Sequence, residues 1–117
     1  MTQIPTVNLK ALGMLMRQDS ERWFPALHSQ PRVPLSVFYA LALAGEAGEF
    51  CNEAKKIVRE VGGDEDKYGP ELADILTYLL LLADELGINL FQEYLKKREV
   101  NEARWGNPEG ATSETRI

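Results

Sequence analysis

Apolar residues recur at helical spacing along this chain, and this periodicity does most to limit what it can fold into. Apolar side chains repeat three and four positions apart through most of the 117 residues, and the alternating pattern of a strand or hairpin is not seen. The clearest case runs from Leu72 to Leu86, which is apolar on almost every side. A helix of that kind is normally buried in a bundle or at a subunit contact. The sequence therefore predicts an all-α fold.

Proline and glycine residues divide the chain into four predicted helices. Proline favours the first turn of a helix, and glycine commonly follows the last turn. The predicted helices span residues 8–24, 34–61, 70–86 and 89–105, with the proline-containing segment 25–34 as a connector that wraps the body. We expect residues 1–105 to form one domain with a four-helix bundle-like core. Residues 106–117 are expected to form a flexible C-terminal tail.

Charge and composition exclude several classes of function. The formal net charge of −5 disfavours binding to nucleic acid polymers or to an anionic membrane surface. No apolar run approaches the roughly 20 residues that cross a bilayer, and the N-terminal residues lack a secretory pattern, so we expect a cytoplasmic protein. With one cysteine, Cys51, and one histidine, His28, any metal must be held mainly by oxygen. Cys51 itself is expected to be a small buried apolar residue.

Acidic residues interrupt the small and apolar sequence of the second predicted helix. Glu46, Glu49 and Glu53 are three and four positions apart, which places them on one helix face. Like charges at this spacing destabilise a helix by a few tenths of a kcal/mol per pair, and a bound cation removes that penalty. The third predicted helix carries Glu71 and Asp74, again three apart, within a span expected to be buried. A buried carboxylate such as that of Asp74 needs a partner.

Antiparallel packing of these two helices brings the acidic pairs opposite each other. Oxygen ligands without sulfur or imidazole favour Mg²⁺, with Mn²⁺ as a possible substitute. Two of the acids also have simpler explanations. Glu71 lies in the first turn of its helix, where the helix dipole favours a negative charge, and Glu53 is compatible with a solvated edge.

The pattern Glu-x-x-Glu followed on the next helix by Glu-x-x-Asp is matched by Glu46, Glu49, Glu71 and Asp74. Together with the stretches GEAGEFCNEAKK and ELADILTYLLLLADELGINL, it resembles the MazG-like branch of the all-α nucleoside triphosphate pyrophosphohydrolase superfamily. The resemblance covers roughly residues 35–104. It implies a four-helix core, assembly as a homodimer or homotetramer, and cleavage of a nucleoside triphosphate between its α and β phosphates.

The resemblance also implies roles for individual residues. Glu46, Glu49, Glu71 and Asp74 would hold Mg²⁺, and either Glu49 or Glu53 would accept a proton from the attacking water. The residues expected at the substrate are Lys56, Tyr78, Lys97, Asn101 and Arg104. The last three resemble a cluster that contacts phosphate or sugar, although they also fit a solvated helix end.

Tyr78 follows Asp74 by one helical turn, which makes it the preferred residue for stacking on a base. Trp23, Phe38 and Tyr39 are also able to stack, but aromatic residues at helical spacing more often form core.

Two alternatives to this enzyme remain. One is a non-catalytic interaction module in which the apolar third helix forms a dimer seam and the acids are surface charge. The other keeps the chemistry and changes the substrate to phosphoribosyl-ATP.

Overall fold

The structure is a computed structural model that describes residues 3–29 and 33–106, and within these ranges it is helical with no strand. The all-α prediction is confirmed. The predicted tail lies outside the described residues from position 107 onward. The helices are α1 (Leu9–Trp23), α2 (Pro25–Ser29), α3 (Leu35–Arg59), α4 (Tyr68–Glu85) and α5 (Leu90–Trp105), with a short 3₁₀ helix η1 (Glu65–Lys67) leading into α4.

Asparagine side chains begin two of the helices. The Asn8 side chain accepts a hydrogen bond from the backbone N–H of Ala11 at 2.9 Å, at the start of α1. Asn89 does the same for Gln92 at 3.2 Å, at the start of α5. Each bond satisfies a backbone donor that has no partner within the helix. The N-terminal boundaries of α1 and α5 therefore agree with those predicted from the sequence.

The end of α3 differs from the prediction. The helix stops at Arg59, because Glu60 adopts a left-handed conformation with φ 57° and closes the last turn. The Glu60 N–H donates to the Ile57 carbonyl, and the Val61 N–H donates to the Lys56 carbonyl. This is the pattern that usually places glycine at the position of Glu60. The glycine pair at 62–63, predicted to end the helix, lies just beyond it.

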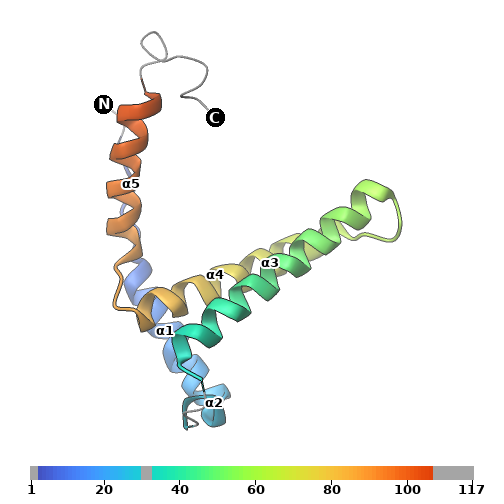
Figure 1. Cartoon of the computed structure of the whole chain (residues 1–117), viewed down its shortest axis with the longest axis horizontal. Coiled ribbons are helices and arrows are strands. Elements are labelled where there is room, and N and C mark those ends of the chain that lie inside the picture. The colour runs from blue at the N-terminus through green and yellow to red at the C-terminus, as the bar shows by residue number, and fades with distance from the viewer. Residues whose placement is uncertain (1–2, 30–32, 107–117) are drawn as a thin grey trace.

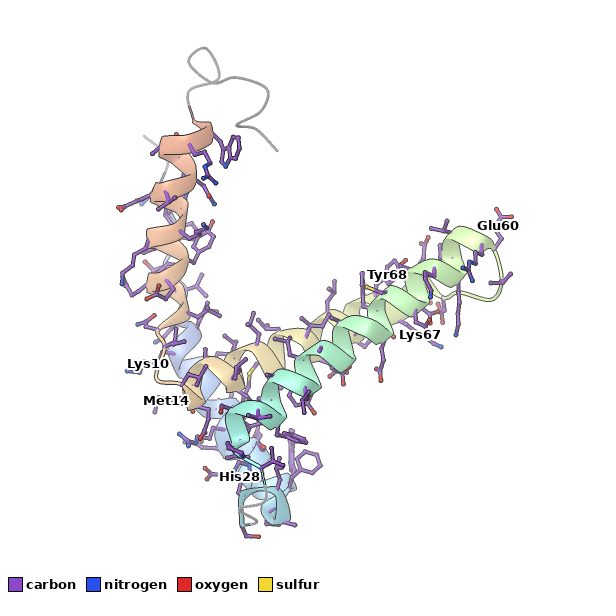
Figure 2. All side chains as sticks on the ribbon, viewed as in Figure 1. Lys10, Met14, His28, Glu60, Lys67 and Tyr68 are labelled. Atoms are coloured by element: carbon purple, nitrogen blue, oxygen red, sulfur yellow. The ribbon has the colours of Figure 1, made fainter. Side chains whose placement is uncertain are left out.

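The segment 25–34 was predicted to be a connector, and its described part contains the additional helix α2. A hydrogen bond of 2.9 Å joins Ser20 Oγ of α1 to His28 Nε2 of α2. This bond links the short helix to the C-terminal part of α1, against which it packs, in the region labelled His28 in Figure 2. The single histidine of the sequence therefore helps to hold the connector.

The helices form two arms (Figure 1). Helices α3 and α4 run antiparallel and side by side as a long hairpin, and α1 crosses α4 near its C-terminal end. After Gly87, which has φ 68°, α5 turns away from the hairpin and packs against α1. The radius of gyration is 18.2 Å, compared with about 13 Å for a compact chain of this length. One chain therefore does not close the four-helix bundle that the sequence predicted, because α5 does not join the hairpin.

The small core lies where α1, α3 and α4 meet. Its buried apolar residues are Tyr39, Leu80, Leu81 and Ala83. Gly13 allows the helices to approach closely, since a Cβ atom there would lie 3.2 Å from the Leu80 carbonyl oxygen. No helix in the described ranges is both long and apolar enough to cross a membrane.

Several residues expected in the core are exposed instead. Trp23 is 62 % exposed, Leu72 51 % and Leu86 53 %, because no other element within residues 3–29 and 33–106 covers the helix faces that carry them. Cys51, expected to be buried, is also exposed. It lies two residues from both Glu49 and Glu53, and therefore on the opposite face of α3 from the seam with α4.

Candidate functional site

Four of the predicted acidic residues lie together on the facing sides of α3 and α4. The pKa of the Glu46 carboxyl is raised, first because burial removes water from it and then by repulsion from Glu49 and Asp74. A hydrogen bond with Glu49 and repulsion from Glu71 act in the same direction. The antiparallel hairpin thus brings the Glu46/Glu49 pair within electrostatic reach of the Glu71/Asp74 pair.

Two oxygen atoms of this acidic cluster (Glu46, Glu49, Glu71 and Asp74) have no protein partner. Glu46 Oε2 and Glu71 Oε2 are buried, and neither accepts a hydrogen bond. Burying a carboxylate oxygen without a donor or a cation is strongly unfavourable. The donor set consists only of carboxylate oxygens, which are the ligands that Mg²⁺ prefers. The acidic cluster therefore fits a small divalent cation.

The cluster is not a finished coordination sphere. Within residues 3–29 and 33–106, no group of three or more histidine, cysteine, aspartate or glutamate side chains converges in the arrangement of a metal centre. Glu49 and Asp74 are exposed, whereas Glu46 and Glu71 are half-buried. Metal binding would therefore require the four carboxylates to come closer together than the structure holds them.

Glu53 has a different environment from the other acids. It is 5 % exposed, so the expectation of a solvated edge is wrong. Its Oε1 atom accepts a hydrogen bond from the backbone N–H of Asp64, eleven residues further along the chain. This bond ties α3 to the connector that leads into η1 and α4. Glu53 therefore has a backbone partner in the connector, whereas Glu49 shares its hydrogen bond with the side chain of Glu46.

The predicted substrate residues are divided between two regions. Tyr78 lies beside the acids, since its pKa is raised by burial and then by the charges of Glu46 and Asp74. Lys56 is exposed in the last turn of α3, toward the tip of the hairpin. The exposed residues Lys97, Asn101 and Arg104 are on α5, which points away from the hairpin of the same chain (Figure 1).

An aromatic pocket lies next to the acidic cluster, between α1, α3 and α4. Its volume is about 480 Å³. Five aromatic residues line it: Trp23, Phe24, Phe38, Tyr39 and Tyr78. The sequence identified four of these as possible stacking residues but did not show that they share a cavity, because they come from three helices. The sequence analysis did not identify Phe24 or Ser20 as pocket residues. The only signal for them was their position, since Phe24 follows Trp23 directly and Ser20 precedes it by one helical turn.

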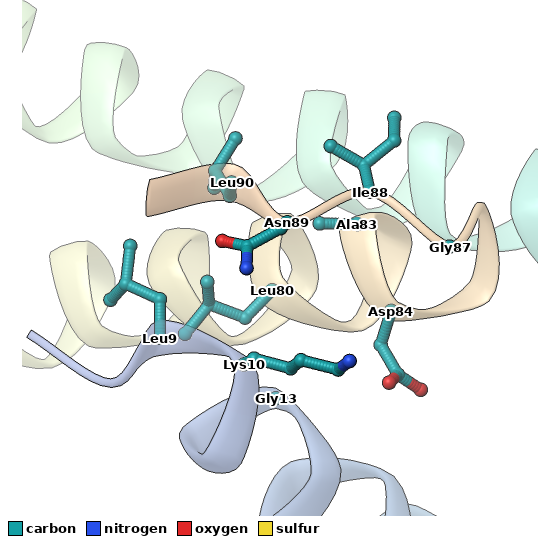
Figure 3. A pocket seen from close by; sticks show the side chains of 10 residues that line it. All are labelled: Leu9, Lys10, Gly13, Leu80, Ala83, Asp84, Gly87, Ile88, Asn89 and Leu90. Carbon is teal, nitrogen blue, oxygen red and sulfur yellow. The ribbon is translucent and has the colours of Figure 1, made fainter. Parts of the chain in front are cut away.

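Two other hollows are present in the described part of the chain. A small cavity of about 150 Å³ lies where α1 meets the end of α4, with the charged side chains of Lys10 and Asp84 in its wall (Figure 3). Arg17 pairs with Asp84 at 3.1 Å and with Glu85 at 3.3 Å, which fixes this junction. An open apolar groove of about 660 Å³ runs between the segment before α1 and the start of α5. Neither hollow borders the acidic cluster.

Comparison with known proteins gives one partial similarity. The chain is 36 % identical over 56 residues to the "Gene 37 protein" of Mycobacterium phage L5. The aligned stretch covers 44 % of this chain and 49 % of the phage protein, so the chain spans about half the length of that curated relative. No protein-family model matches the chain, and no solved structure matches it. The name of the phage protein states no activity.

Proposed function

We propose that this chain is a Mg²⁺-dependent nucleoside triphosphate pyrophosphohydrolase, which converts a ribo- or deoxyribonucleoside triphosphate and water to the monophosphate and pyrophosphate. The main support is that carboxylates lie on the facing sides of α3 and α4. Two of their oxygen atoms, Glu46 Oε2 and Glu71 Oε2, are buried without a hydrogen-bond partner. A cation is the simplest compensation for such oxygens. The motif resemblance to MazG-like proteins points to the same chemistry.

The roles of the chain's residues follow from their positions. The ion would be held by the acidic cluster of Glu46, Glu49, Glu71 and Asp74. When bound, it supplies positive charge that offsets the negative charge of the triphosphate. The water oxygen attacks the α-phosphorus, the bond from that phosphorus to the bridging oxygen breaks, and pyrophosphate leaves. Glu49 accepts the proton of the water, because it is exposed, whereas Glu53 is buried and bonded to Asp64.

A second copy of the chain is part of this proposal. The accessible surface is 8942 Å², compared with about 6,400 Å² for a compact monomer of this mass. The excess is larger than the roughly 800 Å² that each partner buries in a standard interface. We therefore propose a homodimer or homotetramer located in the cytoplasm, in which Lys97, Asn101 and Arg104 bind the phosphates.

Release of pyrophosphate from a panel of nucleotides with Mg²⁺ tests the reaction. The panel contains the ribo- and deoxyribonucleoside triphosphates and phosphoribosyl-ATP. Glu49→Gln and Asp74→Asn are expected to lower kcat/KM at least about 100-fold while the far-ultraviolet circular dichroism stays unchanged. Glu65→Gln, an exposed acid outside the cluster, is the matched control and should retain full activity. Full activity in the two cluster variants, or no release from any nucleotide, would refute the proposal.

The interaction-module alternative has its own support. Seventeen large apolar side chains are exposed among the described residues, whereas four apolar residues are buried. Such a surface suits a protein partner whether or not the chain is an enzyme. The alternative predicts that Mg²⁺ with a triphosphate leaves the thermal stability unchanged, whereas the enzyme is stabilised by its ligands.

A further inference from the structure

The aromatic pocket between α1, α3 and α4 has the dimensions of a ligand site. Its volume of about 480 Å³ falls within the roughly 300–1,000 Å³ typical of small-molecule pockets. Trp23 and Phe24 are 62 % and 58 % exposed, and both line the pocket. Large aromatic surfaces left exposed around a cavity usually mark a binding site.

The pocket wall holds polar groups as well as rings. Ser20 is 7 % exposed, lines the pocket and shares a hydrogen bond with His28. The Ser20 hydroxyl also shares a hydrogen bond with Tyr39. A serine hydroxyl has one donor and two acceptor positions, so these two bonds leave one position for a ligand. An apolar cavity with a few fixed polar groups suits a planar ring with a hydrogen-bonding edge. A purely apolar helix of a protein partner would offer no hydrogen-bonding group to the Ser20 hydroxyl.

The pocket lies a short distance from the acidic cluster along both helices of the hairpin. On α4, Tyr78 follows Asp74 by four residues, or about 6 Å of helix rise. On α3, Glu46 follows Tyr39 by seven residues, or about 10 Å. The rings of Tyr39 and Tyr78 both line the pocket and are 6.4 Å apart, and Tyr78 is also within electrostatic reach of Glu46 and Asp74. A sugar and its first phosphate span this short separation.

We propose that the aromatic pocket binds the heteroaromatic base of the nucleotide, with Trp23 stacking on the ring and Ser20 reading its edge. The inference rests on the proposed function in one respect, namely that the phosphates of the same molecule reach the acidic cluster. It goes beyond that function because it assigns base recognition to α1, whose Trp23 the sequence favoured as a core residue and whose Ser20 it did not identify. It also gives the Ser20–His28 pair a role in selectivity, since α2 holds the hydroxyl in place.

Binding of nucleosides to the full chain without Mg²⁺ tests this inference separately from turnover. Adenosine, guanosine, cytidine and uridine are titrated by calorimetry, and the same titrations are followed by fluorescence in a Trp105→Phe background, where Trp23 is the remaining tryptophan. At least one nucleoside should bind saturably and quench Trp23, whereas ribose should not. Because Trp23 is mostly exposed, Trp23→Ala should fold normally, and we expect about 5- to 150-fold weaker binding from the loss of stacking. Ser20→Ala should change the order of preference among the nucleosides.

The outcomes separate this inference from the proposed reaction. Binding without turnover of any triphosphate would support the pocket and refute the reaction. Turnover without nucleoside binding, or equal binding by Trp23→Ala, would overturn the pocket and leave the reaction standing. A Trp23 signal that changes with protein concentration and not with nucleoside would also overturn it, because a second copy would then cover the pocket.

Discussion

The two candidates for the general base can be separated by exchanging Glu53 for glutamine and for alanine. Glu53 is 5 % exposed and accepts the backbone N–H of Asp64, so its main effect should be on folding. A hydrogen bond to a charged group contributes about 1.5–3 kcal/mol, and a bond between neutral groups about 0.5–1.5 kcal/mol. Glutamine keeps an acceptor oxygen, whereas alanine leaves the Asp64 N–H without one.

These values give a graded expectation for the free energy of unfolding. Glu53→Gln should lower it by about 1 kcal/mol, through the loss of charge on the acceptor. Glu53→Ala should lower it by about 2–3 kcal/mol, since it removes the bond and also about 0.8 kcal/mol of apolar burial per lost methylene. Urea denaturation at one protein concentration, followed by circular dichroism without Mg²⁺, measures both. Glu49→Gln serves as the comparison, and it should keep its stability and lose its activity.

The opposite pattern would refute this reasoning. If Glu53→Gln is as stable as the wild type but as inactive as Glu49→Gln, Glu53 is the proton acceptor. If Glu53→Ala unfolds at the same urea concentration as the wild type, the bond to Asp64 contributes nothing, and the structural role assigned to Glu53 is wrong.

Two further predictions concern stability. Glu60→Gly should raise the free energy of unfolding, measured by urea denaturation, by about 0.5–1 kcal/mol. The reason is that glycine adopts the left-handed φ of 57° at the hairpin tip without strain (Figure 2). A lower stability of the variant would contradict this account of the helix end. Burial raises the pKa of Tyr39 above its ordinary value, so as the pH rises this tyrosine ionises in the unfolded chain before it does in the folded one. The free energy of unfolding that is present below pH 10 should therefore fall as the pH rises further, by up to about 1.4 kcal/mol per pH unit. Tyr39→Phe should flatten that fall in urea denaturation between pH 9 and 11, and an unchanged slope would show that Tyr39 does not cause it.

Local sequence signals predicted the helices and the composition of the acidic cluster. The side-chain caps at Asn8 and Asn89 involve residues three positions apart, so the sequence alone contains both partners. The same is true of the spacing that places Glu46 and Glu49 on one face of α3. The short connector between α3 and α4 then made antiparallel pairing of the two acidic helices the simplest arrangement.

Features that depend on contacts between distant elements were not predictable. Periodicity identifies an apolar helix face but does not show what covers it, so Leu72 and Leu86 were expected in a core and are exposed. The direction of α5 depends on Gly87 and on packing against α1. Glu53 shows the same limitation at the site, since its partner Asp64 lies across the connector. Neither the spacing nor the charge of Glu53 distinguished a ligand from a buried capping residue.

The hairpin of α3 and α4 also has a consequence for the order of folding. Its two helices are consecutive in the chain, so the acidic cluster forms from contacts within residues 46–74. Contacts within one helical chain form in microseconds to milliseconds at a rate that does not depend on concentration, whereas the rate at which two chains associate does depend on it. In the proposed oligomer, each chain therefore brings its carboxylates together without needing a second copy. Dilution should slow the assembly of the proposed oligomer while leaving the rate of hairpin formation unchanged.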